Sequence, residues 1–207
     1  MSFFDPARLA WQRYKTRRKM NRVFSRGEDP FHYGESGYEL KRLAAMDEAL
    51  GKRKFKRGLE LGCAEGHFTK RLLERGGKLL AVDISAVALE RARKAAPGAE
   101  FVEADILSWS PEGTFDLVVI ADVLYYMDKP LVRDQFESTF DRVAKWTEPG
   151  GRLLLAHAFA TEGERGHRES FTRRFLAQGF AAVSQTVVAP DEAENPVRCL
   201  VVLLEKA

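Results

Sequence analysis

Short apolar runs alternate with amphipathic stretches from about residue 56 to the end of the chain. The runs predict strands at residues 58–61, 79–82, 100–103, 115–120, 152–156, 182–188 and 198–204. Apolar side chains at helical spacing predict helices at residues 67–75, 86–95, 129–147 and 168–178. Strands that alternate with helices are typical of a parallel sheet covered on both faces. The pattern therefore predicts an α/β fold with a seven-stranded, doubly wound sheet.

The last two predicted strands break this alternation. Only a loop around residues 191–195 separates them, with no helical stretch between. Strands joined by a short loop pair antiparallel, because a parallel pair needs a crossover of roughly a dozen residues or more. We therefore expect one reversed strand within an otherwise parallel sheet.

The first 50 residues follow a helical pattern instead. A narrow apolar stripe over residues 7–24 predicts one or two helices, and the turn-forming residues 27–30 end them. A second helix is expected over residues 36–50. We divide the chain accordingly into a basic helical arm and lid at residues 1–50 and an α/β domain at residues 51–207.

Composition limits the class of protein. Of the 207 residues, 45% are hydrophobic and 30% are charged, which suits a core that needs no disulfide or metal. Two cysteines, Cys63 and Cys199, exclude a disulfide scaffold and a CxxC zinc site. No apolar run approaches the ~18 residues of a membrane span, and residues 1–27 lack the apolar segment of a secretory signal. We expect a cytoplasmic protein without a transmembrane segment.

The net charge of +3 is unevenly distributed. Residues 1–27 hold eight basic side chains and one acidic one, so they carry +7 and the rest of the chain carries −4. Three roles for this basic arm stay open: a solvated helix docked by its apolar stripe, contact with an anionic membrane surface, and binding of nucleic acid. An anionic lipid-linked or glycan substrate would also be attracted to it.

A glycine-rich loop, Gly62-Cys63-Ala64-Glu65-Gly66, joins the first predicted strand to the helix that follows. The small residues at 62, 64 and 66 allow a tight turn and a close approach of the backbone to a ligand. A tight turn without a ligand is the alternative interpretation. The loop alone does not decide between them.

Three carboxylates at successive strand ends do favour a ligand. Glu60 lies in the first strand, Asp83 ends the second, 17 residues after Gly66, and Asp105 follows the third. The spacing of Asp83 suits a carboxylate that accepts hydrogen bonds from ribose hydroxyls. Asp105 is placed to accept from an adenine amino group while Ile106 covers the ring. Acids at these ends line the ligand crevice of doubly wound sheets, so an adenosyl ligand is expected.

Two residues distinguish among adenosyl ligands. The dinucleotide fingerprint needs a third small residue where this chain has His67, which is too large for a close pyrophosphate approach. Glu60 would repel a pyrophosphate but is compatible with a cationic sulfonium and its amino group. The pattern therefore favours S-adenosylmethionine over NAD.

With these motifs, residues 57–207 resemble the class I S-adenosylmethionine-dependent methyltransferases, a Rossmann-like family with an antiparallel last strand. The resemblance is carried by Glu60-x-Gly62-x-Ala64-x-Gly66, Asp83, Ala104-Asp105-Ile106 and Phe115-Asp116-Leu117-Val118. Ala64 departs from the more usual glycine. Within the family, Asp29-Pro30-Phe31, Tyr38-Glu39 and Val123-Leu124-Tyr125-Tyr126 are similar to the nodulation N-methyltransferase (NodS-like) subgroup, which acts on an amino sugar.

The resemblance implies which residues bind S-adenosylmethionine and its product S-adenosylhomocysteine. Those residues are Tyr33, Tyr38, Glu60, Gly62, Cys63, Ala64, Gly66, Asp83, Ile84, Asp105, Ile106 and Asp122. Asp83 is implied for the ribose, Asp105 and Ile106 for the adenine, and Tyr33 and Tyr38 for a lid. The histidines follow no metal-ligand spacing, so we expect no metal.

The acceptor is expected to meet the methyl group beside Asp122, after the fourth predicted strand. The loop there lacks the Asn/Asp-Pro-Pro-Tyr/Phe signature expected for methylation of a planar base or amide nitrogen. Asp122 is a candidate to contact the cofactor or to draw a proton, with a helix N-cap as the alternative. His157 is expected to face the same cleft as a general base, with a buried histidine bonded to a carbonyl as the alternative. The loop at residues 158–167 is a candidate substrate cover.

Together these observations predict an S-adenosylmethionine-dependent N- or O-methyltransferase. Its acceptor would be a small or medium polar molecule such as a sugar or natural product. Two alternatives remain open: an RNA methyltransferase that uses the basic arm, and a non-catalytic scaffold that binds the nucleoside.

Overall fold

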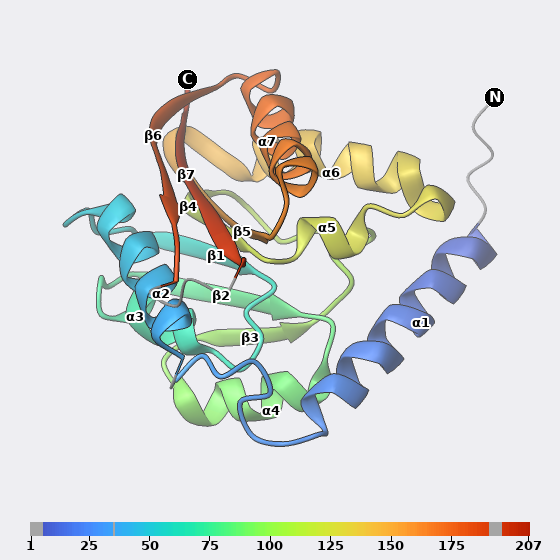
Figure 1. Ribbon diagram of the computed structural model, residues 1–207. Coiled ribbons are helices and arrows are strands. Elements are labelled where there is room, and N and C mark those ends of the chain that lie inside the picture. Colours follow the sequence, from blue (N-terminus) through green and yellow to red (C-terminus); the bar gives the residue numbers. More distant parts are fainter. Residues whose placement is uncertain (1–5, 35, 191–195) are drawn as a thin grey trace.

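A seven-stranded sheet forms the centre of the computed structural model, which describes residues 6–34, 36–190 and 196–207 (Figure 1). The strands are β1 (Arg57–Leu61), β2 (Lys78–Asp83), β3 (Glu100–Glu103), β4 (Phe115–Ala121), β5 (Thr147–Phe159), β6 (Phe180–Val188) and β7 (Arg198–Lys206). Their order is β3-β2-β1-β4-β5-β7-β6, and β7 runs antiparallel to both β5 and β6. The predicted Rossmann-like sheet with a reversed last strand is confirmed. The loop predicted at 191–195 lies outside the described residues.

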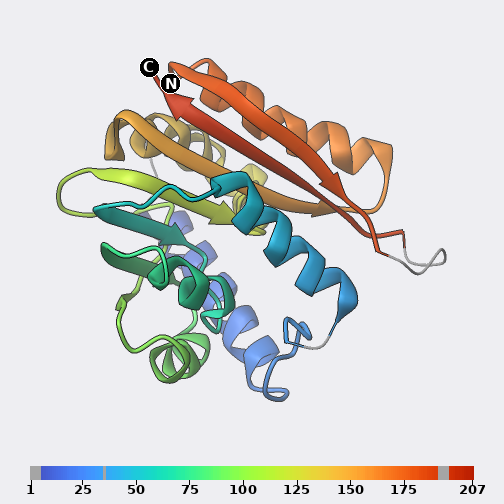
Figure 2. The same ribbon diagram turned by 90° about the vertical axis from the view of Figure 1, so that its left-hand side faces the viewer.

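Helices cover both faces of the sheet, as Figure 2 shows. They are α1 (Pro6–Phe24), α2 (Gly37–Leu50), α3 (His67–Leu73), α4 (Ala86–Ala95), α5 (Leu124–Met127), the 3-10 turn η1 (Pro130–Val132), α6 (Arg133–Trp146) and α7 (Glu162–Leu176). α2 and α3 pack on one face, and α6 and α7 pack on the other. The central strands β1 and β4 are almost wholly buried, as expected for a sheet with two covered faces, whereas the edge strand β6 is largely exposed and the edge strand β3 is partly exposed.

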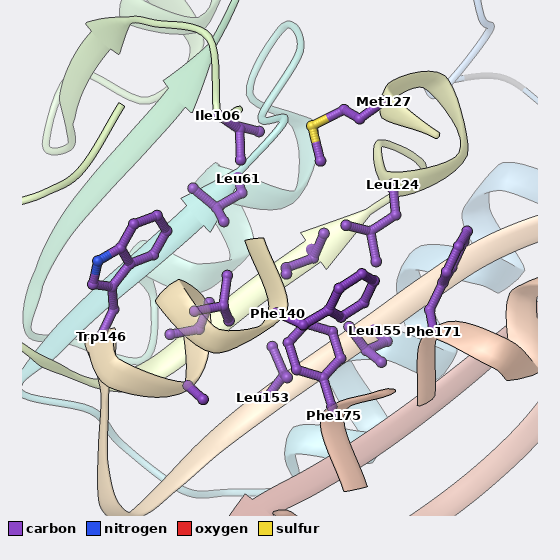
Figure 3. Packing of buried hydrophobic residues seen from close by; sticks show 14 of the residues in the cluster. Leu61, Ile106, Leu124, Met127, Phe140, Trp146, Leu153, Leu155, Phe171 and Phe175 are labelled. Carbon is purple, nitrogen blue, oxygen red and sulfur yellow. The ribbon is translucent and has the colours of Figure 1, made fainter. Parts of the chain in front are cut away.

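An aromatic layer fills the space between the sheet and the helices α6 and α7 (Figure 3). The rings of Phe140 and Phe175 are tilted against each other with centroids 4.9 Å apart, and Phe171 lies beside them near Leu155 of β5. Burying each such side chain stabilises the fold by about 1.5–3 kcal/mol. Trp146 at the end of α6 is 7% exposed and belongs to the same core.

Two boundaries at and before the start of the fifth strand differ from the predicted ones. The strand predicted at residues 152–156 begins earlier, at Thr147, and the pairing of β5 with β4 jumps from Phe115↔Thr147 to Leu117↔Arg152. Gly150, with φ +71°, permits this bulge. The helix predicted over 129–147 is divided into η1 and α6, and the short helix α5 was not predicted.

The loop predicted at residues 158–167 is mostly helix. α7 begins at Glu162, because the side chain of Thr161 accepts a hydrogen bond from the backbone N–H of Glu164 at 3.2 Å. Glu164 in turn accepts from the N–H of Ala160 at 2.6 Å. This reciprocal capping box fixes the helix start, so the segment is not a loop over the substrate.

The described part of the basic arm is a single helix, α1, which lies along the carboxyl ends of the strands (Figure 1). It contacts η1 at one end and α4 at the other. Asn21 and Ser85 share a hydrogen bond of 2.7 Å, and Arg17 pairs with Glu103 at 3.7 Å. The arm is therefore docked on the domain. Its first five residues lie outside the described part of the chain, and the division at residue 50 stays a prediction.

Candidate active site

A cavity of about 230 Å³ opens at the carboxyl ends of β1, β2 and β4. Its floor comes from the strand ends and the loops after them: Gly62, Ala64, Asp83, Ile84, Ala104, Asp105, Ile106, Ala121, Asp122, Val123 and Ala158. Its cover comes from the arm and from what we call the lid segment, residues 28–34, together with the start of α2. The cover residues are Thr16, Met20, Phe24, Phe31, Tyr33, Tyr38 and Glu39.

The glycine-rich loop forms a tight turn at one side of this cavity. Residues 62, 64 and 66 all have positive φ, of +83°, +48° and +85°. A Cβ on Gly62 would meet the Cβ of Val123 at 2.9 Å, so only glycine fits there. Ala64 adopts the left-handed conformation despite its methyl group. The loop therefore has the close-turning backbone that its sequence predicts.

Asp83 connects this loop to the helix after β2. Its carboxylate accepts hydrogen bonds from the backbone N–H of Ala64 at 3.0 Å and of Ser85 at 2.8 Å. Burial raises the pKa of Asp83, and these N–H groups lower it. The side chain is 8% exposed and lines the cavity. Backbone donors thus hold an acceptor at the position expected to meet ribose hydroxyls.

Glu60 lies beside a smaller cavity that adjoins the first. It is 3% exposed, and its Oε2 accepts a hydrogen bond of 2.6 Å from the hydroxyl of Thr69. Burial raises the pKa of Glu60 to about 8, against the hydrogen bond from Thr69. A carboxyl group in this state is stabilised as an anion when a cationic ligand lies next to it. Cys63 lines the same smaller cavity.

Asp105 and the two isoleucines form the far end of the main cavity. Asp105 accepts a hydrogen bond from the N–H of Leu107 at 3.1 Å, and burial raises its pKa. Ile84 and Ile106 line the cavity on either side of it. Gly66 lines neither cavity: a Cβ there would meet Ala92 at 3.2 Å, so it allows α3 to approach α4.

Asp122 lies at the centre of a half-buried polar cluster beyond β4. Its Oδ1 accepts from the N–H of Ala158 at 2.7 Å and from the hydroxyl of Tyr125 at 3.2 Å. Its Oδ2 pairs with Nη1 of Arg42 at 2.9 Å. The N-cap position of α5 is occupied by Val123, so the alternative interpretation of Asp122 as a helix N-cap is wrong.

Arg42 and Glu39, both from α2, were missed in the sequence. The Arg42 side chain is 4% exposed and pairs with Glu39 at 2.7 Å as well as with Asp122. Burial disfavours its charge, but the two carboxylates together raise its pKa. A signal was available: Arg42 lies four residues from Tyr38 and four from Met46, within the buried stripe of α2. A cation in that stripe indicates a buried partner.

The structure does not bring His157 to the cavity. Its side chain is 2% exposed and packs edge-on against Phe171 and Tyr125, with ring centroids 5.4 and 6.2 Å away. Burial lowers the pKa of His157 to about 4. Neither ring nitrogen has a hydrogen-bond partner, so the alternative of a histidine hydrogen-bonded to a backbone carbonyl is also wrong. β5 continues to Phe159, so side chains alternate and Ala158 lines the cavity instead.

Tyr33 and Tyr38 lie in the cover, as the resemblance implies. The Tyr33 ring lies 5.2 Å from that of His67 and 5.4 Å from the Arg42 guanidinium. The hydroxyl of Tyr38 is buried without a hydrogen-bond partner. Burial raises the pKa of both phenols, so both stay protonated donors.

The side chains around the two cavities fit S-adenosylmethionine. Fixed carboxylates suit the ribose and adenine, apolar side chains suit the base, and buried Glu60 suits a cationic group. Residues 59–151 match the family model described as a methyltransferase domain. Nodulation protein S of Bradyrhizobium diazoefficiens is 30% identical over 169 residues, which cover 78% of this chain and 72% of that protein. The chain belongs to the class I S-adenosylmethionine-dependent methyltransferases.

Two further comparisons place it near nodulation protein S among these methyltransferases. The protein of that name from Rhizobium tropici is 30% identical over 145 residues, or 68% of this chain; they span about 60% of the relative's length. The crystal structure of N-methyltransferase NodS from Bradyrhizobium japonicum WM9, in complex with S-adenosyl-L-homocysteine, superposes with a TM-score of 0.80. It is 25% identical, and the match covers 92% of this chain and 98% of that one. Among the described residues of this methyltransferase, no helix has the length and apolar character to cross a membrane.

Proposed function

We propose that this methyltransferase transfers a methyl group from S-adenosylmethionine to a nitrogen or oxygen of a small or medium polar acceptor, such as a sugar or natural product. The observation that carries the proposal is the covered cavity at the strand ends, where Asp83 is fixed by the glycine-rich loop and Glu60 is buried beside it. Its family membership supports the same reaction. S-adenosylhomocysteine would be the product.

In this proposal the residues of β1 to β3 hold the cofactor. Glu60, Gly62 and Ala64 receive its amino-acid part, Asp83 accepts from the ribose, and Asp105 lies at the adenine between apolar neighbours. When bound, S-adenosylmethionine supplies an electrophilic methyl group on a cationic sulfur. The protein aligns the acceptor with that group and keeps water out, and such alignment is the main catalytic contribution available to it.

On the acceptor side we propose Asp122 and Tyr38 rather than His157. Both line the cavity, whereas His157 lies behind Tyr125 with a lowered pKa. Asp122 already accepts from Arg42, Tyr125 and Ala158, so its role is to fix the cavity wall. The unpartnered hydroxyl of Tyr38 is free to bind a polar group of the acceptor or cofactor.

For the arm we propose a part in covering the cavity, because Thr16, Met20 and Phe24 of α1 line it. A docked wall of this kind suits a small acceptor better than an RNA or a membrane surface. The thiols of Cys63 and Cys199 are free, which supports a reducing compartment such as the cytoplasm as the place of action.

The decisive experiment is a screen for transfer of tritiated methyl from S-adenosylmethionine to amino sugars, phenolics, organic acids, lipids and RNA. We expect label in a small polar acceptor, and competition by S-adenosylhomocysteine. Label in RNA alone would establish the RNA methyltransferase instead. If S-adenosylhomocysteine binds by calorimetry but no acceptor is labelled, the protein acts as a scaffold.

A further inference from the structure

Three side chains far apart in the sequence meet where the lid segment touches the glycine-rich loop. Asp29 belongs to the lid segment, Glu65 to the loop, and His67 is the first residue of α3. One nitrogen or carboxylate oxygen from each lies within 4.8 Å of the others. Carboxylate and imidazole ligands together suit transition metals such as zinc, whereas calcium and magnesium prefer oxygen alone.

Glu65 carries an unsatisfied acceptor. Its side chain is 4% exposed, and Oε1 pairs with the guanidinium of Arg91. Oε2 is buried and has no hydrogen-bond partner. Leaving such an atom without a partner is unfavourable, and buried charges are normally paired or coordinated to metals. An ion beside Oε2 would remove this cost.

Asp29 is held in place by its own turn. Its backbone has φ +48°, and its two carboxylate oxygens accept from the N–H groups of Tyr33 and Gly34, both at 2.8 Å. Its Oδ1 lies 3.8 Å from Nε2 of His67, too far for a hydrogen bond. Ligand atoms around a tetrahedral zinc ion lie about 3.4 Å apart. The three ligand atoms, which lie within 4.8 Å of one another, must therefore draw together to bind one.

Although the spacing of the histidines along the chain led us to expect no metal, the fold brings these three residues together, and we propose that Asp29, Glu65 and His67 bind a divalent transition-metal ion of the zinc class, with water completing the coordination. The two carboxylates and the one nearby guanidinium leave a net negative charge of one beside the imidazole of His67. Arg91 also donates to the carbonyl of Gly27 at 2.7 Å, so it stays anchored beside the ion. The bound ion joins the lid segment to the glycine-rich loop.

This link has a consequence for the cavity. Phe31 and Tyr33 of the lid segment line it, and Gly62 and Ala64 line it from the loop. An ion held by both sides restrains the lid segment in the covered arrangement. Bound S-adenosylhomocysteine should therefore leave more slowly when the ion is present. This second effect rests on the proposed cofactor, whereas binding of the ion does not.

The test uses the full chain, freed of metal by a chelator, with Zn²⁺ followed by calorimetry and Co²⁺ followed by visible absorption. We expect one ion per chain and the absorption bands of tetrahedral Co²⁺. Loss of a residue that merely supports a metal ligand weakens metal affinity by roughly 10–100-fold. Loss of a ligand itself should cost at least as much, so we expect His67→Ala and Glu65→Gln each to weaken binding by at least that factor. His32→Ala, an exposed histidine of the same lid segment, is the matched control and should bind normally.

Several outcomes would overturn the site. Absence of saturable binding by the wild type does so directly. Equal binding by wild type and His67→Ala, with both folded by circular dichroism, places any ion elsewhere, as does loss of binding in His32→Ala. If His67→Ala does not fold, His67→Gln replaces it. A metal site confirmed in a protein that labels no acceptor would leave the site intact and refute only the proposed reaction.

Discussion

The two halves of the sheet's carboxyl edge hold their acids by different means. Beyond β2 and β3, Asp83 and Asp105 accept from backbone N–H groups, which come from the glycine-rich loop and from each acid's own turn. Beyond β4, Asp122 depends on Arg42, 80 residues earlier in the chain, and on Ala158 of β5. We call these the cofactor half and the acceptor half.

The difference separates two tasks. Backbone donors hold the acids of the cofactor half without depending on any other side chain, so the cofactor site is fixed by local structure. The acids of the acceptor half are paired with a cation only when α2 is docked, because Arg42 comes from that helix. Changes in the acceptor half should therefore reduce stability, while changes in the cofactor half should mainly reduce binding.

The largest effect is expected for Arg42→Met. Removing the buried guanidinium leaves the half-buried Asp122 and Glu39 without their cation, which should lower the free energy of unfolding by about 3 kcal/mol, the lower end of the range for broken buried ion pairs. Urea denaturation measures this. Lys94→Met, at an exposed ion pair, is the control and should change stability by less than about 1 kcal/mol. A loss as small as that of the control would remove the distinction between the halves.

The second prediction concerns the buried His157 behind the acceptor half. Its pKa is lowered to about 4, so between pH 6.5 and 4 the unfolded chain binds a proton that the folded chain does not. Its contribution to stability is therefore complete above pH 6.5 and falls as the pH drops, by roughly 3 kcal/mol at pH 4.

His157→Phe should remove this acid sensitivity, seen as a flatter dependence of the urea midpoint on pH between 4 and 6.5. His32→Phe, at an exposed histidine, should keep the slope of the wild type. Parallel slopes for all three proteins would show that His157 is charged in the folded state.

In the cofactor half, Asp83→Asn should weaken S-adenosylhomocysteine binding at least tenfold, about 1.4 kcal/mol, because one acceptor for the ribose becomes a donor. Calorimetry measures the affinity. Asp116→Asn changes a carboxylate that accepts from the backbone of Lys56 and Arg57, outside the cavity, and should leave it unchanged. Equal affinities in all three proteins would refute the ribose assignment.

The smallest effect is a pH dependence due to Glu60. With a pKa of about 8 it is protonated at pH 7, and a cationic ligand must displace that proton. The affinity for S-adenosylmethionine should rise with pH by at most about tenfold per unit and level off above pH 8. Glu60→Gln should flatten the curve. A wild-type affinity that does not change between pH 6.5 and 8.5 would contradict the placement of the cation beside Glu60.

The two halves also differ in how far they could be predicted from sequence. At Gly62 and at Asp83 the strand end and the ligand-binding residues lie within a few residues of each other. The local sequence pattern was therefore enough to predict that both lie at the carboxyl edge of the sheet. The partnership of Arg42 with Asp122 depends on how α2 docks, which no local pattern contains. The expectation that His157 lines the cavity was wrong for a similar reason. Which side chain of β5 points into the cavity depends on where the strand ends, and β5 continues past His157 to Phe159.

Boundaries failed where turn-forming residues serve another purpose. Gly150 forms a bulge inside β5 rather than a turn before it. Gly163 and Gly166 suggested a loop, yet the capping box of Thr161 and Glu164 begins a helix there. Glycine marks a backbone that is free to bend, and the surrounding hydrogen bonds decide whether it does.

The reversed strand β7 has one more consequence. Because β7 runs against β5, its amino end reaches the carboxyl edge of the sheet, and Val197 just before it lines the cavity. Val197, at the end of the connection from β6 to β7, thus contributes to the wall of the cavity. Insertions or deletions in that connection can alter which acceptor is admitted while the machinery for the methyl donor stays unchanged. Relatives of this fold can diverge in substrate at a single hairpin.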